Sequence, residues 1–543
     1  MLAFIRHWNE CLKRCFMIFR QVSKDHSTLV TQLFDTCQKF LQLLNYHLAV
    51  FVLQAETQSP GLLPECDNLC HHINLLRKRF SIPEPDDRRL CLFLQKPIHF
   101  FIRIVFPLVM CRRIEIIVYI CRDQHFTIMF RHILLAVALL SILTLHAQSP
   151  AKLRSEIVKD LKENILRFWI HHAVDPSGGF YGRLKRDGTP VADAPKGGVL
   201  NARILWTFST AYRMYGDSVY KVMADRAQRY FTDHFVDEEY GGAYWLVRAD
   251  GSLLDGTKQT YGCSYAVYGL AEHFRATGNI ESLRHAVEIY RTMERIIRDP
   301  VQDGYIETFA RNWQQPEKIG YDGDGVATKT MNTHIHVLEA YTALYRVWRN
   351  PGLRERLHRL TELMADKFYN PVTHHLNLYF DRNWNNLNDI DSYGHDIETS
   401  WLLTEAAELL DDDSLKTRCS KLSLALCDAA LADGLNDKGG MMYERNGNKL
   451  RRDSQWWCQA ETVLGCVNAW QLTGEARYLR AAERTWSYIK QYVVDTECGE
   501  WFKSISADGR PNLDEDKASM WYCPYHNARM GFEIDARLKE AKQ

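Results

Sequence analysis

Four short segments in the second half of this 543-residue chain concentrate residues that can do chemistry. Each combines histidine or glutamate with other polar or aromatic residues, and three of the four contain a histidine. Histidine titrates near neutral pH, so two of them can act as a base and an acid that remove a proton and return it. The segments are Met331-Asn332-Thr333-His334-Ile335-His336, Tyr393-Gly394-His395-Asp396-Ile397-Glu398, Trp456-Trp457-Cys458-Gln459-Ala460-Glu461 and Cys523-Pro524-Tyr525-His526-Asn527.

Helical spacing places the polar residues of the first segment on one face. Asn332, His336 and Glu339 share that face, whereas His334 points elsewhere. Ionisable side chains on a buried helix are costly unless they have partners, so a cluster of them marks a candidate functional site.

The second and third segments show a similar arrangement. His395, Glu398 and Trp401 follow one another at i, i+3 and i+6, and Trp457 lies one turn before Glu461. Both segments therefore present ionisable and aromatic side chains near the start of a predicted helix.

These residue types suit proton transfer at a carbon next to a carbonyl group. Epimerisation of an aldose at that carbon needs a base on one face and a proton returned from the opposite face. The intermediate is an enediolate, so a fixed cation such as Arg203 would stabilise the developing negative charge. Tryptophan faces would hold a second sugar. The sequence has no phosphate-binding glycine loop, no dinucleotide fingerprint and no HExxH motif.

Each of these residues also has a purely structural explanation. A single histidine on an apolar helix is usually a core residue, and Glu339, Glu398 and Glu461 could pair with a buried arginine. Trp456 and Trp457 could fill the core. A functional site is favoured because three histidines, three glutamates and one arginine recur near the same ends of different helices.

The helices that must position these residues begin near Leu153. About twelve segments carry apolar residues at helical spacing, separated alternately by short turns and by glycine-containing loops, with a repeat of about 60–70 residues. This alternation predicts an all-α fold, an (α/α)6 barrel of six helical hairpins, in which the helices after the short turns form the outer ring. An open α-solenoid is the alternative, but its inner helices would not need polar and aromatic residues. The predicted inner ring includes 200–215, 332–348, 397–410 and 456–472.

Composition narrows the class of partner. The net charge is zero, whereas a nucleic-acid-binding protein usually carries a basic excess.

Residues 1–128 are an extension of unclear status that contains one glycine, many of the 15 cysteines and no sustained helical or strand period. The cysteines show neither zinc-ligand spacing nor a compact disulfide framework.

Residues 129–148 look like a complete secretory signal peptide. Arg131 precedes the apolar run 133–145, and small residues follow near Ala147. This pattern predicts that translation starts at Met129 and that the protein is exported, to a periplasm, without stable membrane insertion after cleavage. The alternative is a genuine N-terminal region, with the apolar run as a buried helix, in a cytoplasmic protein.

The four segments closely resemble those of the cellobiose 2-epimerases, within the N-acylglucosamine 2-epimerase superfamily. The resemblance covers about 151–543 and includes the order and spacing of the motifs. It implies a barrel enzyme that needs no cofactor or metal and that reversibly epimerises the reducing-end sugar of a β-1,4-linked disaccharide, such as cellobiose or mannobiose. The family usually lacks an export signal, so 129–148 is a departure that concerns location and not chemistry.

The resemblance also implies roles for individual residues. His395 and His526 correspond to the acid/base pair at C2, His336 to a third histidine that assists ring opening or holds the open-chain sugar, and Arg203 to the arginine near the carbonyl oxygen. Glutamates and aromatic residues would orient the histidines and bind the sugar. These are Glu398 and Glu461 as carboxylates, and Asn332, Trp401, Trp456, Trp457, Trp521 and Tyr244 as substrate contacts.

Other activities are compatible with the same residues. An aldose–ketose isomerase, a monosaccharide epimerase or an N-acylglucosamine 2-epimerase would use the same histidines. A glycoside hydrolase would use paired carboxylates and would not need three histidines. A metal site built from His336, His395 and His526 and a non-enzymatic scaffold are weaker alternatives. We expect a small disaccharide as the partner and a monomer or weak homo-oligomer.

Overall fold

The computed structural model describes residues 150–315 and 327–540. The predicted extension 1–128 and the signal-like segment 129–148 lie outside the described residues. Among the helices of the described part, none is long and apolar enough to cross a membrane.

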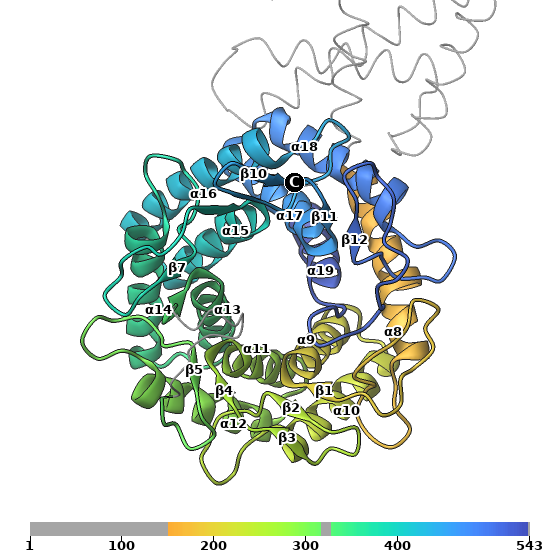
Figure 1. The fold of residues 1–543 in the computed structure, drawn as a ribbon, viewed down its shortest axis with the longest axis vertical. Helices are drawn as coiled ribbons and strands as arrows, with labels where there is room; N and C mark the ends of the chain where they lie inside the picture. Colours follow the sequence, from red (N-terminus) through yellow and green to blue (C-terminus); the bar gives the residue numbers. More distant parts are fainter. Residues whose placement is uncertain (1–149, 316–326, 541–543) are drawn as a thin grey trace, which may run out of the picture. The chain divides into compact units, whose positions relative to one another are not determined.

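In the described part of the chain, six inner helices form a closed ring, which Figure 1 shows end-on. Neighbouring helices contact one another in sequence order, and the last contacts the first, which closes the barrel. Because each inner helix is followed or preceded by an outer helix of opposite direction, all six inner helices run parallel. They are α9 (Gly198–Tyr215), α11 (Thr260–Thr277), α13 (Met331–Val347), α15 (Tyr393–Leu410), α17 (Trp456–Thr473) and α19 (His526–Glu540).

The outer ring surrounds these helices and confirms the predicted barrel of six hairpins (Figure 1). Its first member, residues 150–172, packs on α19, so the two ends of the described chain complete one hairpin. This first member contains η3 (Leu161–Leu166) and α8 (Arg167–His172). The others are α10 (Ser218–His234), α12 (Ile280–Thr292) with η4 (Met293–Ile297), α14 (Pro351–Leu363) with η5 (Met364–Phe368), α16 (Asp413–Gly434), and α18 (Ala476–Tyr488) with η6 (Ile489–Val493).

Apolar patterning explains which helices lie inside. On α9, every residue from Gly198 to Ala211 is buried, because this helix packs against neighbours on all sides. On the outer helix α18, burial is confined to a stripe that includes Tyr478, Ala482 and Trp486. The inner helices therefore bury any polar residue that they carry, and such residues need partners.

Short strands, which the sequence patterns did not indicate, connect the loops at one end of the barrel. A strand ends directly before each of α9, α11, α13, α15 and α17, and each of these strands pairs antiparallel with a strand from the next long loop. Neighbouring loops thus fix where each inner helix begins. The pairs are β1 (Lys196–Gly197) with β2 (Leu246–Val247), β4 (Lys258–Gln259) with β5 (Thr308–Phe309), β6 (Lys329–Thr330) with β7 (Tyr379–Phe380), β8 (Ile390–Ser392) with β9 (Glu444–Asn446), and β11 (Ser454–Gln455) with β12 (Ser504–Ile505); β3 (Leu253–Asp255) and β10 (Lys449–Arg451) extend two of these sheets.

Buried ion pairs reinforce the same loops. Lys258 Nζ donates to Asp237 Oδ2 at 2.8 Å, and both side chains are fully buried. Arg311, from the next loop, donates to the same carboxylate at 3.0 Å. Because each arginine comes from the following loop, these groups of buried ion pairs hold neighbouring loops together, and we call them loop clamps. Equivalent clamps are Lys196 with Asp175, Lys329 and Arg382 with Asp299, and Lys517 and Arg186 with Asp495.

Candidate active site

The predicted site residues gather at the N-terminal ends of the inner helices. His526 is the first residue of α19, His395 lies in the first turn of α15, and Trp457 is the second residue of α17. The imidazoles of His395 and His526 both pack on the Trp457 indole, with ring-centroid separations of 4.6 and 5.5 Å. The two histidines that the sequence resemblance assigns to proton transfer therefore lie beside the same aromatic ring.

Both histidines are held through their Nδ1 atoms. His526 Nδ1 lies 2.8 Å from Glu461 Oε1, and His395 Nδ1 lies 2.7 Å from Ser392 Oγ. None of the described residues forms a hydrogen bond to Nε2 of either ring. Each Nε2 is therefore available for a substrate, and the Nδ1 contact sets the direction in which it points.

Arg203 and His336 meet through the hydroxyl group of Tyr265. This hydroxyl receives a hydrogen bond from Arg203 Nη2 at 2.7 Å and lies 3.0 Å from Nδ1 and 3.3 Å from Nε2 of His336. Arg203 also donates to Tyr261 Oη at 2.8 Å and to the carbonyl oxygen of Trp521 at 3.2 Å, but it forms no ion pair with a described carboxylate. A buried guanidinium with only neutral partners can stabilise negative charge that develops on a bound substrate.

Burial favours the neutral form of the three histidines, because it disfavours the positive charge of an imidazolium. It lowers the pKa of His395 to about 3 and the pKa of His336 to about 4. Burial, with the charges of Arg203 and Arg529, lowers the pKa of His526 well below its ordinary value. All three imidazoles are therefore neutral at pH 7, which is the state that a base requires.

Arg529 is a central residue that the sequence analysis missed. Its guanidinium donates to Glu339, Glu398 and Glu461, with Nη2 2.7 Å from Glu461 Oε1. The structural explanation that these glutamates pair with a buried arginine is thus correct for all three. The signal was present, because Arg529 lies one turn after His526 on the same helix and three buried glutamates require a counter-charge.

The glutamates that surround Arg529 differ in their ionisation state. Burial and the charge of Glu461 raise the pKa of Glu398 to about 8. Burial would also raise the pKa of Glu339, but Arg529 and His336 outweigh it and lower that pKa to about 2. At pH 7 Glu398 therefore carries a proton, while Glu339 is ionised.

The tryptophans occupy different depths. Trp457 contacts both histidines, and Trp456 packs edge-on against Tyr522 at 4.7 Å and is largely buried. Trp401, predicted as a sugar contact, is 2% exposed and donates from Nε1 to Glu461 Oε2 at 2.9 Å. Trp401 therefore supports Glu461 from the interior of the barrel, because its side chain on α15 points into the core and away from the N-terminal ends of the inner helices.

Two further predicted contacts lie nearer the surface. Asn332 is half-buried in the first turn of α13, and Trp521 is half-buried and packs edge-on against Tyr261 at 5.7 Å. Tyr244, also predicted as a sugar contact, instead belongs to a loop clamp. Its hydroxyl accepts from Arg311 at 3.2 Å, and Lys258 Nζ lies 4.6 Å from its ring centre.

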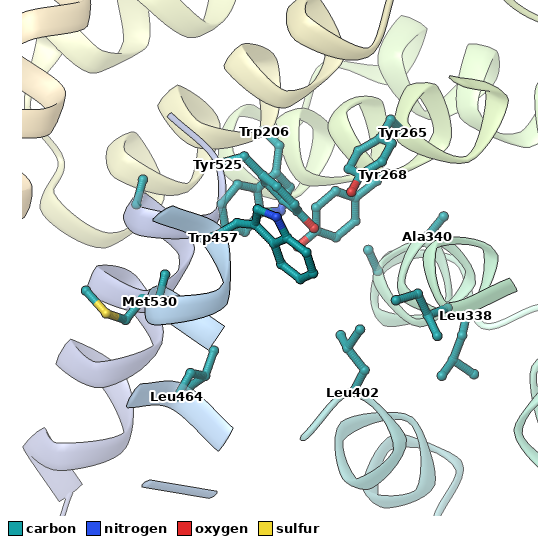
Figure 2. Close-up of a cluster of buried hydrophobic side chains, with 14 of the residues drawn as sticks. Trp206, Tyr265, Tyr268, Leu338, Ala340, Leu402, Trp457, Leu464, Tyr525 and Met530 are labelled. Carbon is teal, nitrogen blue, oxygen red and sulfur yellow. The ribbon is translucent and has the colours of Figure 1, made fainter. Parts of the chain in front are cut away.

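Aromatic residues from several helices line the interior beneath the site. Figure 2 shows Trp206, Tyr265, Tyr268, Tyr525 and Trp457 gathered around the interior of the barrel. Within this group Tyr525 contacts Tyr265 and Trp206 edge-on, with centroid separations of 5.3 and 5.6 Å. The sequence analysis did not single out the tyrosines of α11, although their helical spacing places them on one face.

Gly394 allows Trp457 to lie against His395. A Cβ atom at this position would lie 2.5 Å from Cys458 Sγ and 2.6 Å from a ring carbon of Trp457. Side-chain carbons do not approach so closely, so any larger residue would displace α17 or the indole.

Glu398, Glu461 and His526 lie close enough together to resemble a set of metal ligands. Arg529, however, already donates to both carboxylates, and Glu461 also accepts from Trp401. The chemistry of this donor set matches a guanidinium, which supplies the positive charge that the carboxylates require.

Comparison with known proteins agrees with this geometry. The sequence profile of the N-acylglucosamine 2-epimerase (GlcNAc 2-epimerase) family matches residues 179–527, which is more than half of the chain. This chain belongs to that family. The matched region contains the residues of the site described above except Arg529, which lies two residues beyond its end.

Individual relatives cover nearly the whole described region. A cellobiose 2-epimerase from Bacteroides fragilis is 44% identical over 386 residues, which cover 70% of this chain and 98% of the relative. A cellobiose 2-epimerase from Ruminococcus albus is 37% identical over 389 residues, with coverage of 70% and 98%. The solved structure of cellobiose 2-epimerase from Bacillus thermoamylovorans has a TM-score of 0.69 and 36% identity, covering 71% of this chain and 100% of its own.

Proposed function

We propose that this protein catalyses the reversible 2-epimerisation of the reducing-end sugar of a β-1,4-linked disaccharide, with cellobiose or mannobiose as substrate. The observation that carries the proposal is the pair of histidines, His395 and His526, which both pack against Trp457 and whose Nε2 atoms form no hydrogen bond with the described residues. The relatives named as cellobiose 2-epimerases support the class of substrate.

The chemistry requires only the movement of protons. Nε2 of one histidine takes the proton from C2 of the open-chain sugar, and the electrons of the C–H bond form the C1–C2 double bond of an enediolate. Arg203 stabilises the negative charge on the oxygen. The second histidine, which is neutral in the resting protein, gains a proton from solvent and returns it to the opposite face of C2. Loss of the abstracted proton to solvent then restores the first histidine, and His336 assists ring opening or holds the open chain.

Incubation with cellobiose in D2O tests this proposal. We expect a disaccharide with mannose at the reducing end that carries deuterium at C2, identified by NMR and mass spectrometry. Mannobiose should give the corresponding glucose epimer. A ketose as the only product would replace the proposal with an aldose–ketose isomerase, and release of monosaccharides would replace it with a glycoside hydrolase.

Two histidine variants test the mechanism. His395→Ala and His526→Ala should each lose nearly all epimerase activity, because each removes one of the two groups that move the C2 proton. His358→Ala is the matched control, since His358 lies on the outer helix α14, 3.4 Å from Asp412. Wild-type turnover in either inner-ring variant would contradict the assigned roles.

We also propose that residues 129–148 direct export and that translation starts at Met129. The basic start, the apolar run 133–145 and the small residues near Ala147 support this proposal. N-terminal sequencing of the native protein should find a start close to Gln148, and any peptide from 1–128 would contradict it.

A further inference from the structure

Arg529 joins three glutamates that come from three different inner helices. Nη1 donates to Glu339 on α13, and Nη2 donates to Glu398 on α15 and to Glu461 on α17. The side chain is 1% exposed, and its guanidinium carbon lies 4.8 Å from the centre of the Trp401 ring. It is thus enclosed by protein groups and lies beneath the site.

Two of these carboxylates hold two of the three histidines. Glu461 Oε1 lies 2.8 Å from His526 Nδ1, and Glu339 Oε2 lies 3.0 Å from His336 Nδ1. His395 is held by a serine hydroxyl group and is outside this network. One buried cation is therefore connected to two of the histidines through two separate carboxylates.

The ionisation state of each carboxylate decides the tautomer of its histidine. An ionised carboxylate accepts a proton from Nδ1–H and leaves a lone pair on Nε2, which can act as a base. A protonated carboxyl group donates to Nδ1 instead, so the ring proton moves to Nε2 and the base is lost. A cation beside a carboxylate favours its ionised form.

We propose that Arg529 is the positioning residue that keeps Glu339 and Glu461 ionised and correctly oriented, so that Nε2 stays unprotonated on both His336 and His526. The inference rests on the proposed function. It adds a residue that does not touch the substrate and that prepares two histidines through their carboxylates.

Other charged and titratable groups face this cluster and act on the same equilibrium. Arg203 opposes a positive charge on His526, and Glu398 opposes the ionisation of its neighbours Glu339 and Glu461. Burial raises the pKa of Glu461, and the charge and hydrogen bond of Arg529 act against this effect. The groups are Arg203 from α9, Tyr265 and Tyr268 from α11, His336 and Glu339 from α13, His395, Glu398 and Glu405 from α15, Cys458 and Glu461 from α17, Tyr525 directly before α19, and His526 at the start of α19.

The test compares Arg529→Met with Arg529→Lys across pH. Loss of the charge should lower kcat at pH 7 by about 10- to 100-fold, as is usual for groups that orient a catalytic residue. KM should change little, because Arg529 is buried. The residual kcat should rise with pH as the two carboxylates lose their protons, and Arg529→Lys, which keeps the charge, should recover part of the loss and shift the profile back.

Arg537→Met is the matched control. Arg537 lies two turns further along α19 and also lies near Trp401, at 5.9 Å, but it pairs with Glu533 and does not contact the three glutamates. A folded Arg529→Met protein with the wild-type kcat and pH profile would overturn the inference. A wild-type protein that makes no epimer would instead refute the proposed function, so the two failures are distinguishable.

A measurement on the unaltered protein covers the case in which Arg529→Met does not fold. With 15N-labelled histidine, NMR reports which ring nitrogen carries the proton. We expect Nε2 of His526 and His336 to be unprotonated at pH 7, with assignment by His526→Gln and His336→Gln. A proton on Nε2 of both residues in the resting enzyme would refute the inference.

Discussion

The proton on Glu398 gives a prediction whose size follows from the structure. Burial and the charge of Glu461 raise the pKa of Glu398 from 4.5 to about 8 in the folded protein. A raised pKa means that the folded state binds this proton more tightly than the unfolded state does. The contribution of this proton to the free energy of unfolding is complete below pH 4.5. It is lost as the pH rises toward 8, by roughly 1.4 kcal/mol per pH unit within that range.

Glu398→Gln isolates this contribution, because glutamine has nearly the same shape and stays neutral at every pH. Between pH 5 and pH 8 the wild type should lose about 3–4 kcal/mol of unfolding free energy relative to the variant. Guanidinium unfolding of both proteins at each pH, followed by circular dichroism, measures this difference. Glu288→Gln, on the exposed side of α12, controls for the loss of one carboxylate.

The same variant should keep most of its epimerase activity at pH 7, since the wild-type side chain is already neutral there. Glu398→Ala should be much less active, because it removes the oxygen that accepts from Arg529 and leaves a cavity. A difference in unfolding free energy between wild type and Glu398→Gln that stays constant from pH 5 to pH 8 would show that Glu398 is ionised, and the reasoning about the cluster would be wrong.

Three further changes test the supporting structure. Lys258→Met should destabilise the protein by about 3–5 kcal/mol in guanidinium unfolding, because it leaves the buried Asp237 carboxylate with only Arg311; an effect below 1 kcal/mol would mean that the clamp is dispensable. Gly394→Ala should cost about 1–3 kcal/mol and lower kcat, since the new methyl group displaces Trp457, and unchanged kinetics would contradict that packing. Trp401→Phe should cost about 1–3 kcal/mol, because Glu461 loses a buried hydrogen bond, whereas a neutral result would indicate that water replaces the indole.

The sequence alone determined the architecture and the members of the site. Helical periodicity and the alternation of turn types are local features, so they predicted the six hairpins and which helices lie inside. Spacing within a helix also predicted that His334 points away from the other polar residues. Its ring is hydrogen-bonded to the backbone carbonyl group of Thr330 and the backbone N–H group of Tyr305 in the core. The short strands between loops were missed, because two-residue segments carry no periodic signal.

Only the tertiary structure decided how side chains from different helices meet. Spacing placed Trp457 near Glu461, but the indole that bonds Glu461 is that of Trp401, from the neighbouring helix. Tyr244 belongs to a loop clamp for the same reason, since its hydroxyl group accepts a hydrogen bond from Arg311 of the next loop. The role of Arg529 depends on glutamates from three helices, and the charge of each depends on the burial and neighbours that the closed barrel creates.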